Sequence, residues 1–412
     1  MLLARAIADM VRIGRLTLVD AAGQRHLFEG APGPAVTVRL HDPALNWKLL
    51  YRPKLRVPEA YMDGTLTIEE GTLYDFLELM VLNHQGASSQ LLRLGEYGAR
   101  LTRRFRQYNP MPRARRNVAH HYDLSDQLYE LFLDRDRQYS CAYFRGPDDD
   151  IDNAQLNKKR HIAAKLLLRP GDKVLDIGCG WGGMALYLAT EWDVDVTGLT
   201  LSAEQHAVAQ RRAAAAGLSD RVRFFLRDYR EERGQYDRIV SVGMFEHVGV
   251  NHYGQFFTQL KSMLNPDGVA LLHHIGRMDG PGSTNPWMRK YIFPGGYSPA
   301  LSEVTPAVER ARLWITDIEI LRLHYADTLR AWRVRFEQNR DRIRALYDER
   351  FCRMWELYLT GSELAFRRQG HLVFQMQLAN TMDAVPRTRD YMVDWEREHT
   401  GLGPPREADR AA

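Results

Sequence analysis

Residues Val174 to Gly183 read Val-Leu-Asp-Ile-Gly-Cys-Gly-Trp-Gly-Gly and are the most informative segment for the fold. In it an apolar strand ends, a glycine-rich turn follows, and a helix is expected to begin. Glycines let the backbone approach a ligand closely, and a helix N-terminus offers free N–H groups. The spacing Gly-x-Gly-x-x-Gly is met from Gly178 to Gly183, although a lone match of this kind is weak. The stretch predicts a ligand-binding loop at the end of a strand.

Alternating strand and helix patterns surround this loop. Apolar runs predict strands, and helical spacing predicts helices between them. The expected strands are 173–177, 194–199, 222–226, 239–242, 269–275, 315–323 and 372–378, and the expected helices are 182–189, 203–216, 253–264 and much of 327–369. This alternation predicts an α/β fold in which helices cover both faces of a doubly wound, mostly parallel sheet.

The residues before this region predict a second, smaller domain. Strand patterns at 16–19 and 36–40 and a helical pattern from Leu73 to Val81 indicate an N-terminal α+β domain over residues 1–100. The Asn109-Pro110-Met111-Pro112 stretch marks a break, so we expect a basic linker at 101–116 and a catalytic domain at 117–394. The polar segment 395–412 is expected to be disordered.

Composition narrows the class of protein. The chain has 412 residues, of which 45% are apolar and 26% charged, as is typical of a globular protein with two or three domains. No apolar run approaches the ~18 residues of a membrane-spanning helix, and the N-terminus does not resemble a secretory signal. An odd, sparse set of cysteines (Cys141, Cys179 and Cys352) favours a reducing cytoplasm over a disulfide framework.

The positive charge is concentrated at the N-terminal end. Residues 1–116 contain 17 Lys and Arg against 11 Asp and Glu, a net charge of +6, whereas the whole chain carries +4. Seven arginines and no acidic residue lie between Arg100 and Arg116, with Phe105 and Tyr108 among them. Such a stretch is either a solvated linker or a contact for an anionic membrane surface, and no nucleic-acid motif accompanies it. We therefore expect a lipid surface, and no nucleic acid, as the partner.

The loop 174–183 resembles motif I of class I S-adenosylmethionine (SAM) methyltransferases. Most such enzymes carry an acid after the second strand, whereas this chain reads Gly198-Leu199-Thr200-Leu201-Ser202, a departure typical of the cyclopropane-fatty-acyl-phospholipid synthase and mycolic acid methyltransferase family. Further blocks resemble that family in the same order: 121–125, 131–134, 139–144, 198–205, 237–249, 271–276, 291–296 and 324–329. The segment Glu59-Ala60-Tyr61-Met62-Asp63-Gly64 resembles the extra N-terminal domain of the bacterial synthases.

The resemblance assigns two sets of residues. Cofactor contacts map onto Tyr139, Ser140, Gly178, Gly180, Thr200, Gln205, Asp228 and Tyr229, and a bicarbonate site maps onto Cys141, Glu246, His273, Ile275 and Tyr325. All five ion-site positions carry the residue that the family uses. Two other positions differ from the family pattern: His274 stands where relatives often have threonine, and Pro58 stands where many have glycine. We expect His274 to influence nearby pKa values.

These residues would serve a demanding reaction. Methyl transfer from SAM to a cis double bond leaves a carbocation, and a base must remove a proton from the new methyl group before a ring can close. The resemblance implies that Glu246 accepts a hydrogen bond from bicarbonate, that His273 and Tyr325 donate to it, and that backbone near Cys141 and Ile275 completes the cradle. The pocket must be dry and aromatic, and Tyr139, Phe144, Tyr291, Phe293 and Tyr325 occur in motif segments.

Plainer interpretations exist for single residues and for the whole chain. Without the family, Cys141 would be a small buried hydrophobe, His273 a core histidine and Tyr325 a packing residue. No metal-ligand spacing is found, because the histidine pairs are adjacent in sequence.

The expected function is SAM-dependent formation of cyclopropane rings in unsaturated phospholipid acyl chains. Alternatives are a methyl-branched or methylene product, a small-molecule methyltransferase, or a SAM- or lipid-binding module without activity.

The resemblance also bears on assembly and location. Related bacterial synthases suggest a homodimer. A lipid enzyme without a membrane span needs contact with the bilayer surface. We therefore expect a cytoplasmic protein that associates peripherally with the inner face of the membrane.

Overall fold

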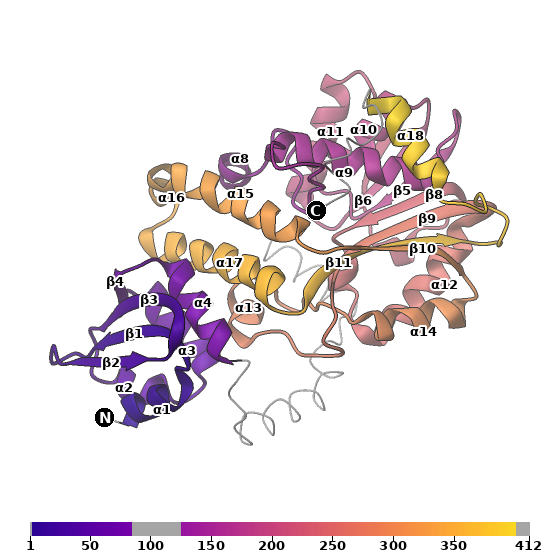
Figure 1. Cartoon of the computed structure of the whole chain (residues 1–412). Helices are drawn as coiled ribbons and strands as arrows, with labels where there is room; N and C mark the ends of the chain where they lie inside the picture. The colour runs from indigo at the N-terminus through magenta and orange to yellow at the C-terminus, as the bar shows by residue number, and fades with distance from the viewer. Residues whose placement is uncertain (1, 85–124, 401–412) are drawn as a thin grey trace.

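The structure, a computed structural model, describes residues 2–84 and 125–400. Residues 2–84 form the small N-terminal domain, which lies at one end of the molecule (Figure 1). Its sheet has the order β2-β1-β3-β4, in which only β1 and β3 pair in parallel. Its elements are β1 (Ile13–Val19), β2 (Arg25–Glu29), β3 (Ala31–Leu40), β4 (Leu66–Glu70), α1 (Leu2–Met10), α2 (Leu45–Lys48), α3 (Pro53–Met62) and α4 (Leu73–His84). The expected α+β character is confirmed.

A seven-stranded sheet forms the centre of the large domain. Its order is β10-β11-β9-β8-β5-β6-β7, and β11 alone runs antiparallel to its neighbours. The strands are β5 (Lys173–Ile177), β6 (Asp195–Thr200), β7 (Val222–Leu226), β8 (Tyr236–Val242), β9 (Leu264–Arg277), β10 (Trp314–Leu321) and β11 (His371–Ala379). The predicted mostly parallel α/β sheet is confirmed, with the strands within a few residues of their expected positions.

Helices cover both faces of this sheet (Figure 1). One face carries α9 (Ile151–Leu166), α10 (Gly183–Glu191) and α11 (Ala203–Ala215), and the other carries α12 (Tyr253–Met263) and α14 (Leu301–Ala311). Side chains alternate between the two layers, because successive residues of a strand point to opposite faces. Leu271 packs with α9 and α10, whereas Leu272 packs with α12. By the same alternation His273 and Ile275 lie on the α9 face.

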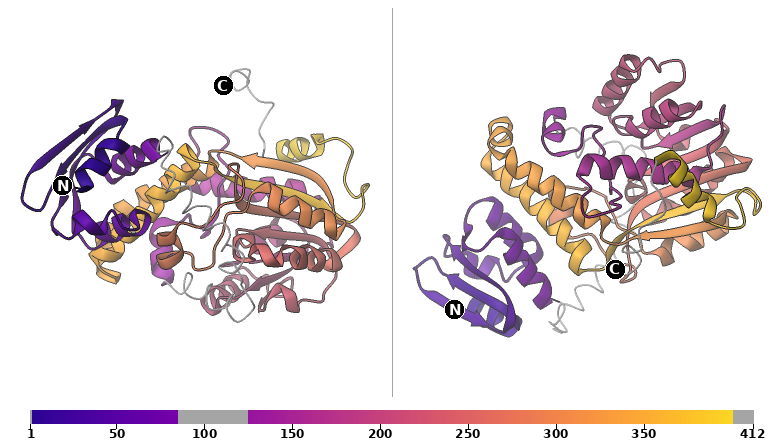
Figure 2. Two further views of the ribbon diagram at one scale, coloured as in Figure 1. Left: turned by 90° about the horizontal axis from the view of Figure 1, so that it is seen from below. Right: turned by 45° about the horizontal axis from the view of Figure 1, so that its top comes forward.

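The two domains meet through a long helical arm. This arm consists of α15 (His324–Gln338), α16 (Arg340–Leu346) and α17 (Glu349–Arg368), and α17 lies beside the N-terminal domain in both views of Figure 2. One hydrophobic core runs through both domains. Polar contacts add to it, since Tyr61 donates a hydrogen bond to Glu356 at 2.9 Å and Arg368 pairs with Glu78 at 2.8 Å. Short elements complete the fold: α8 (Asp126–Phe132), α13 (Pro286–Tyr291), and the 3₁₀ turns η1 (Tyr229–Glu231), η2 (Phe245–His247) and η3 (Val250–His252).

The C-terminal end of the large domain differs from the expected one. The expected disorder from residue 395 is wrong for 395–400, which belong to α18 (Asp390–Thr400). Met392 and Trp395 give this helix an apolar side, and the Trp395 ring lies 5.1 Å from that of Trp192. The expected basic linker 101–116 lies outside the described residues.

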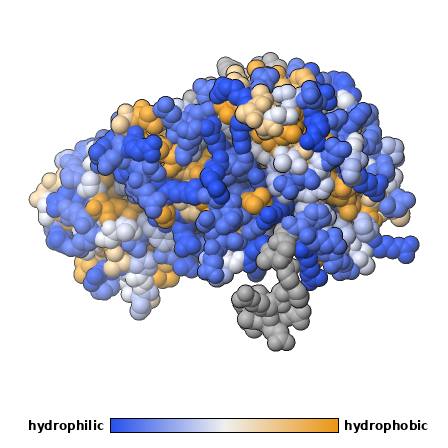
Figure 3. Space-filling model, turned by 90° about the horizontal axis from the view of Figure 1, so that it is seen from above, coloured by the Kyte–Doolittle hydropathy of each residue, from blue (hydrophilic) through white to orange (hydrophobic). Residues whose placement is uncertain are grey.

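The surface is mixed in character. On the face in Figure 3, apolar side chains form separate patches among hydrophilic ones. Among residues 2–84 and 125–400, no helix is long and apolar enough to cross a membrane.

Candidate active site

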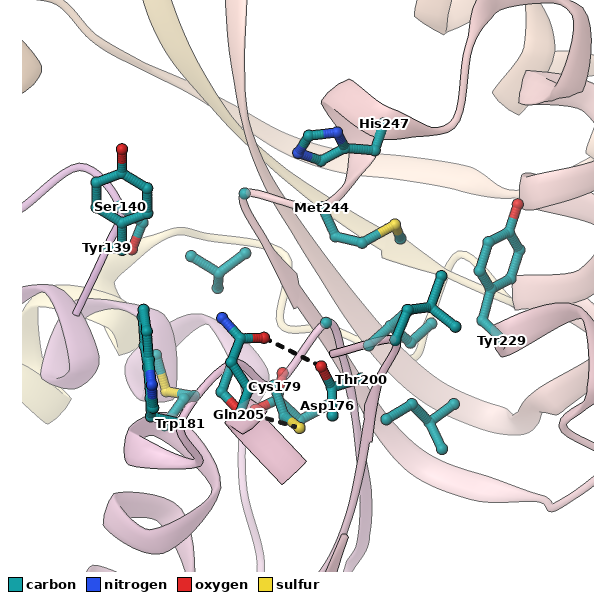
Figure 4. Close-up of a pocket in the computed structure, with 18 of the residues that line it drawn as sticks. Tyr139, Ser140, Asp176, Cys179, Trp181, Thr200, Gln205, Tyr229, Met244 and His247 are labelled. Atoms are coloured by element: carbon teal, nitrogen blue, oxygen red, sulfur yellow. Dashed lines mark hydrogen bonds between the residues drawn. The ribbon is translucent and has the colours of Figure 1, made fainter. Parts of the chain in front are cut away.

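A pocket opens at the carboxyl ends of β5, β6 and β8, where ligands bind in sheets of this kind (Figure 4). All eight residues assigned to the cofactor line it: Tyr139, Ser140, Gly178, Gly180, Thr200, Gln205, Asp228 and Tyr229. They come from four separate segments of the chain, 139–140, 178–180, 200–205 and 228–229. The fold therefore brings the whole predicted set to one cavity.

Glycine is required at two positions of the loop. Gly178 has φ +85°, and a Cβ there would lie 2.7 Å from the Cβ of Met244. Gly182 has φ +83° and would place a Cβ 2.6 Å from the Phe224 ring. Both conformations are strained for other residues. By contrast, a Cβ at Gly180 would meet nothing within 4 Å, so its backbone is open to a ligand in the pocket.

Two neutral polar side chains replace the missing acid after β6. Thr200 donates a hydrogen bond to Gln205 Oε1 at 3.1 Å, and both side chains are buried at the pocket wall (Figure 4). Farther along, Asp228 lies in the pocket lining but accepts two hydrogen bonds from the Arg230 guanidinium at 2.8 and 2.7 Å. On this side of the pocket, therefore, the hydrogen-bonding groups are neutral and the Asp228 carboxylate is already paired with a cation.

A buried lysine holds the segment that carries Tyr139 and Ser140. Lys158 Nζ donates to Ser140 Oγ at 2.9 Å and to Gln138 Oε1 at 2.6 Å. Burial lowers the pKa of Lys158 to about 8. The Tyr139 hydroxyl lies 2.8 Å from that of Tyr358 on α17. The helical arm and α9 therefore fix this side of the pocket together.

Glu246 and Ile275 of the predicted ion site are in direct contact. Glu246 follows β8 in η2, and its Oε1 accepts a hydrogen bond from the Ile275 amide at 2.6 Å. Its other oxygen, Oε2, is buried without a partner among the described residues. Burial raises the pKa of Glu246 to about 7. The side chain is therefore able to carry a proton near neutral pH.

His273 lies two residues before Ile275 on the same face of β9. Its carbonyl accepts a hydrogen bond from the amide of Gly243, a pocket residue, at 2.9 Å. Burial, with nearby Lys158, holds the pKa of His273 well below its ordinary value, so the ring is neutral. Nδ1 lies 3.1 Å from Gln375 Nε2, whereas Nε2 is buried and has no partner among the described residues.

Cys141 and Tyr325 come from the segment before α9 and from the helical arm. Cys141 is fully buried, its thiol donates to the Ala142 carbonyl at 3.3 Å, and burial raises its pKa. The next amide, that of Ala142, donates to Thr328 Oγ1 at 3.0 Å, which ties the segment to α15 near Tyr325. Both Cys141 and Tyr325 belong to the same hydrophobic core as Ile275. None of the five predicted ion-site residues lines the cofactor pocket itself.

His274 points to the opposite face of the sheet from His273. Its ring is fully buried beside Phe245 and Phe374, at 5.0 and 5.5 Å. Burial lowers the pKa of His274 to about 4, so it is neutral. The neighbouring His274 contributes to the low pKa of His273, which agrees with the expectation that His274 influences nearby pKa values.

Several pocket residues were missed by the sequence interpretation. Trp181 donates from Nε1 to Asp126 Oδ1 at 2.9 Å, and His247 is a neutral pocket residue because burial lowers its pKa to about 4 (Figure 4). Asp176 lines the pocket with Oδ2 unpartnered among the described residues, and burial raises its pKa to about 7. Asp176 and Trp181 lie inside the quoted glycine motif, so the motif carried the signal that identifies them.

Comparison with known proteins agrees with this geometry. Residues 110–376 match the family described as mycolic acid cyclopropane synthetase. The chain is 38% identical to the cyclopropane-fatty-acyl-phospholipid synthase of Escherichia coli, over 82% of this chain and 86% of that protein. It is 41% identical to a tuberculostearic acid methyltransferase of Mycobacterium tuberculosis, over 64% of this chain and 65% of that protein.

A solved structure supports both the fold and the cofactor. Mycolic acid cyclopropane synthase CmaA1, crystallised with SAH and CTAB, superimposes with a TM-score of 0.61 at 34% identity, covering 66% of this chain and 99% of that chain. The expected class I methyltransferase fold is confirmed, and so is SAM as the cofactor of the enzyme. The chain belongs to the mycolic acid cyclopropane synthetase family and is a SAM-dependent C-methyltransferase.

Proposed function

We propose that this enzyme converts cis double bonds in the acyl chains of membrane phospholipids into cyclopropane rings. The observation that carries the proposal is a buried carboxyl, Glu246, and a buried imidazole, His273, which adjoin residues of the SAM pocket. Each has one polar atom without a partner among the described residues. Ordinary N- or O-methylation needs no such pair, because the substrate itself supplies the electron pair and loses the proton.

The SAM pocket fits a cofactor with a cationic head. SAM supplies an electrophilic methyl group on a positively charged sulfur. Gly180 leaves backbone open to the pocket, and Asp176 Oδ2 is buried without a partner among the described residues. A carboxyl group whose pKa burial raises to about 7 is ionised more readily beside a cation. Thr200 and Gln205 offer neutral hydrogen-bonding groups in place of the usual acid.

The residues of the ion site also fit a small oxyanion. Bicarbonate, when bound, would supply a base close to the reacting carbon. Within the predicted ion site, Glu246 Oε2 and His273 Nε2 are buried polar atoms that have no partner among the described residues and could hold it. A carboxyl with a raised pKa can keep a proton and donate to an anion instead of repelling it. The Ile275 amide already serves Glu246, so Ile275 acts by orienting that carboxyl.

A connected set of aromatic rings runs from Tyr139 of the pocket to Tyr325 of the predicted ion site. The ring centroids of Tyr139 and Trp332 lie 5.2 Å apart, and those of Trp332 and Tyr325 lie 5.9 Å apart. Phe293 and Tyr358, whose rings lie 5.7 Å apart, extend this aromatic cluster. Aromatic faces stabilise cations and exclude the water that would trap a carbocation. This environment supports chemistry on an isolated double bond.

A lipid assay identifies the product of the reaction. Purified protein is incubated with SAM and vesicles of monounsaturated phospholipid, and the acyl chains are analysed by gas chromatography and mass spectrometry. We expect chains heavier by one CH₂ that have lost the double bond and gained a ring. A methyl-branched or methylene product that is still unsaturated would favour the alternative, in which the cation shifts a hydride before losing its proton. Bound SAM with unchanged lipid would refute the phospholipid substrate.

Glu246 and His273 are expected to act in turnover and not in SAM binding. Glu246→Ala and His273→Ala should each lower turnover by at least about 100-fold, the usual contribution of a group that assists proton transfer. Neither side chain lines the SAM pocket. The SAM dissociation constant, measured by calorimetry, should therefore change less than about threefold. Loss of SAM affinity in both variants would contradict the assigned roles.

We further propose that the protein is cytoplasmic and reaches its substrate by docking on the inner face of the membrane. The N-terminal domain supports this with exposed apolar side chains at Trp47 (67% exposed), Leu50 (38%) and Tyr51 (63%). Arg52 lies over the Tyr51 ring at 5.3 Å, and Lys48 and Lys54 are close in sequence. Aromatic side chains flanked by basic residues suit the headgroup region of an anionic bilayer.

Vesicle sedimentation tests the docking surface. Trp47→Ser with Tyr51→Ser should weaken binding to anionic vesicles, and added salt should weaken the binding of the unmodified protein. Trp314→Ser is the matched control, because Trp314 is 48% exposed but lies on β10 of the large domain. Equal binding by all three proteins would refute this surface. The homodimer stays a prediction, which the molar mass in solution tests.

A further inference from the structure

A row of polar side chains crosses three neighbouring strands and ends at His273. In the antiparallel pairing of β9 with β11, His273 lies directly opposite Gln375, and in that of β11 with β10, Gln375 lies opposite Glu319. These strands lie side by side in Figure 1, with α9 over them. Residues directly opposite each other share a face of the sheet. All three side chains therefore face α9, which contributes Lys165.

Lys165 determines which way the Gln375 amide points. The ammonium group of Lys165 lies 2.7 Å from Gln375 Oε1, and Glu319 accepts a hydrogen bond from the same ammonium. An ammonium group only donates, so it requires the amide oxygen of Gln375 to face it. The amide nitrogen must then face the other way, toward His273 Nδ1 at 3.1 Å.

The amide nitrogen in turn determines the tautomer of His273. An NH₂ group only donates, so His273 Nδ1 must be the acceptor and carry no proton. A neutral imidazole then carries its proton on Nε2. That atom is buried and without a partner among the described residues. A cationic ring would also carry a proton on Nδ1, which would point at the amide donors of Gln375. The positive charges of Lys158 and Lys165 disfavour a cationic His273 as well.

We propose that Gln375, held by Lys165, is a positioning residue that keeps His273 in the Nε2–H tautomer and so presents a hydrogen-bond donor to the reaction centre. This inference rests on the proposed function, in which His273 donates to a bound oxyanion. Lys165 is itself anchored, because Glu319 also bonds to His161 at 2.6 Å, and His161 contacts Glu396 of α18 at 2.5 Å. The C-terminal helix is thereby joined to the support of the site.

The tautomer can be read directly. Protein labelled with ring-¹⁵N histidine is studied by long-range ¹H–¹⁵N correlation, and His273 is assigned from the signal that His273→Gln removes. We expect a protonated Nε2 and a bare Nδ1 in the unmodified protein without SAM or lipid. A protonated Nδ1 would overturn the inference, whatever the variants do.

Gln375→Glu tests the consequence for turnover. A carboxylate at this position keeps Lys165 as its partner but offers only acceptors to His273, so the proton should move to Nδ1 or the ring should become cationic. Turnover should fall about 10- to 100-fold, the usual cost of losing a partner that orients a functional histidine. SAM affinity should stay within about twofold. A changed tautomer with unchanged turnover would overturn the positioning role.

Two further variants test the role of Lys165 and provide a control. Lys165→Met removes the group that orients the amide, and it should let Gln375 turn its oxygen to Nδ1, with the same change in tautomer. Gln377→Met is the matched control, because Gln377 is equally buried on the same face but bonds to the Lys165 carbonyl and to Tyr391. It should leave the His273 signal unchanged. A protein that never modifies lipid would refute the proposed function, while the tautomer of the unmodified protein still decides this inference.

Discussion

Glu246→Gln should make the protein less sensitive to rising pH. The substitution keeps the size of the side chain and an oxygen that can accept from the Ile275 amide. It removes the titrating group, whose pKa burial raises from 4.5 to about 7. A raised carboxyl pKa contributes stability that is fully present below about 4.5 and is lost as the pH rises through about 7.

The size of this difference in stability follows from the pKa shift of Glu246. Each pKa unit corresponds to about 1.4 kcal/mol. A small part of this stability is already lost at pH 5. Between pH 5 and pH 8, the stability of the unmodified protein should therefore fall by about 2–3 kcal/mol more than that of Glu246→Gln. Asp176, whose pKa is also raised to about 7, titrates in both proteins and cancels in the difference.

Urea unfolding at several pH values measures this difference. Both proteins are unfolded at pH 5, 6, 7 and 8, and the free energy of unfolding is extrapolated to water. The difference between them should grow steadily over this range in favour of Glu246→Gln. Curves that stay parallel within about 0.5 kcal/mol would refute the claim that Glu246 is held as a buried acid, since the expected change is several times the uncertainty of the extrapolation.

Three further substitutions test the fold around the site. Gly178→Ala should weaken SAM binding and lower stability by ~1–3 kcal/mol, because its Cβ would overlap Met244 at a positive φ; calorimetry and thermal unfolding measure both. Gly254→Ala, in α12 with no atom within 4 Å of the added Cβ, should instead raise the free energy of unfolding by ~0.5–1 kcal/mol, and a loss of stability there would contradict the packing. Trp395→Ala should speed amide hydrogen exchange throughout α18, and unchanged exchange would show that its contact with Trp192 does not hold the helix.

Much of the site could be predicted because its signals are local. The glycine loop is readable since positive φ angles and close approach at Gly178 and Gly182 admit almost no other residue. The alternation of strand and helix patterns gave the sheet and its two helical layers. The eight cofactor residues were assigned from a family resemblance, and the fold brings all of them to one pocket.

Patterns in the amino-acid sequence were sufficient to predict the fold class and the glycine loop, and the family resemblance added Glu246 and His273 as candidate site residues. Only the tertiary structure brought Gln375 and Lys165 to His273, because they are 102 and 108 residues away from it in the chain and meet it through the antiparallel pairing of β11 and the packing of α9. The raised pKa of Glu246 likewise depends on burial. Cross-strand register and burial arise from contacts between distant segments, so no local pattern could specify them.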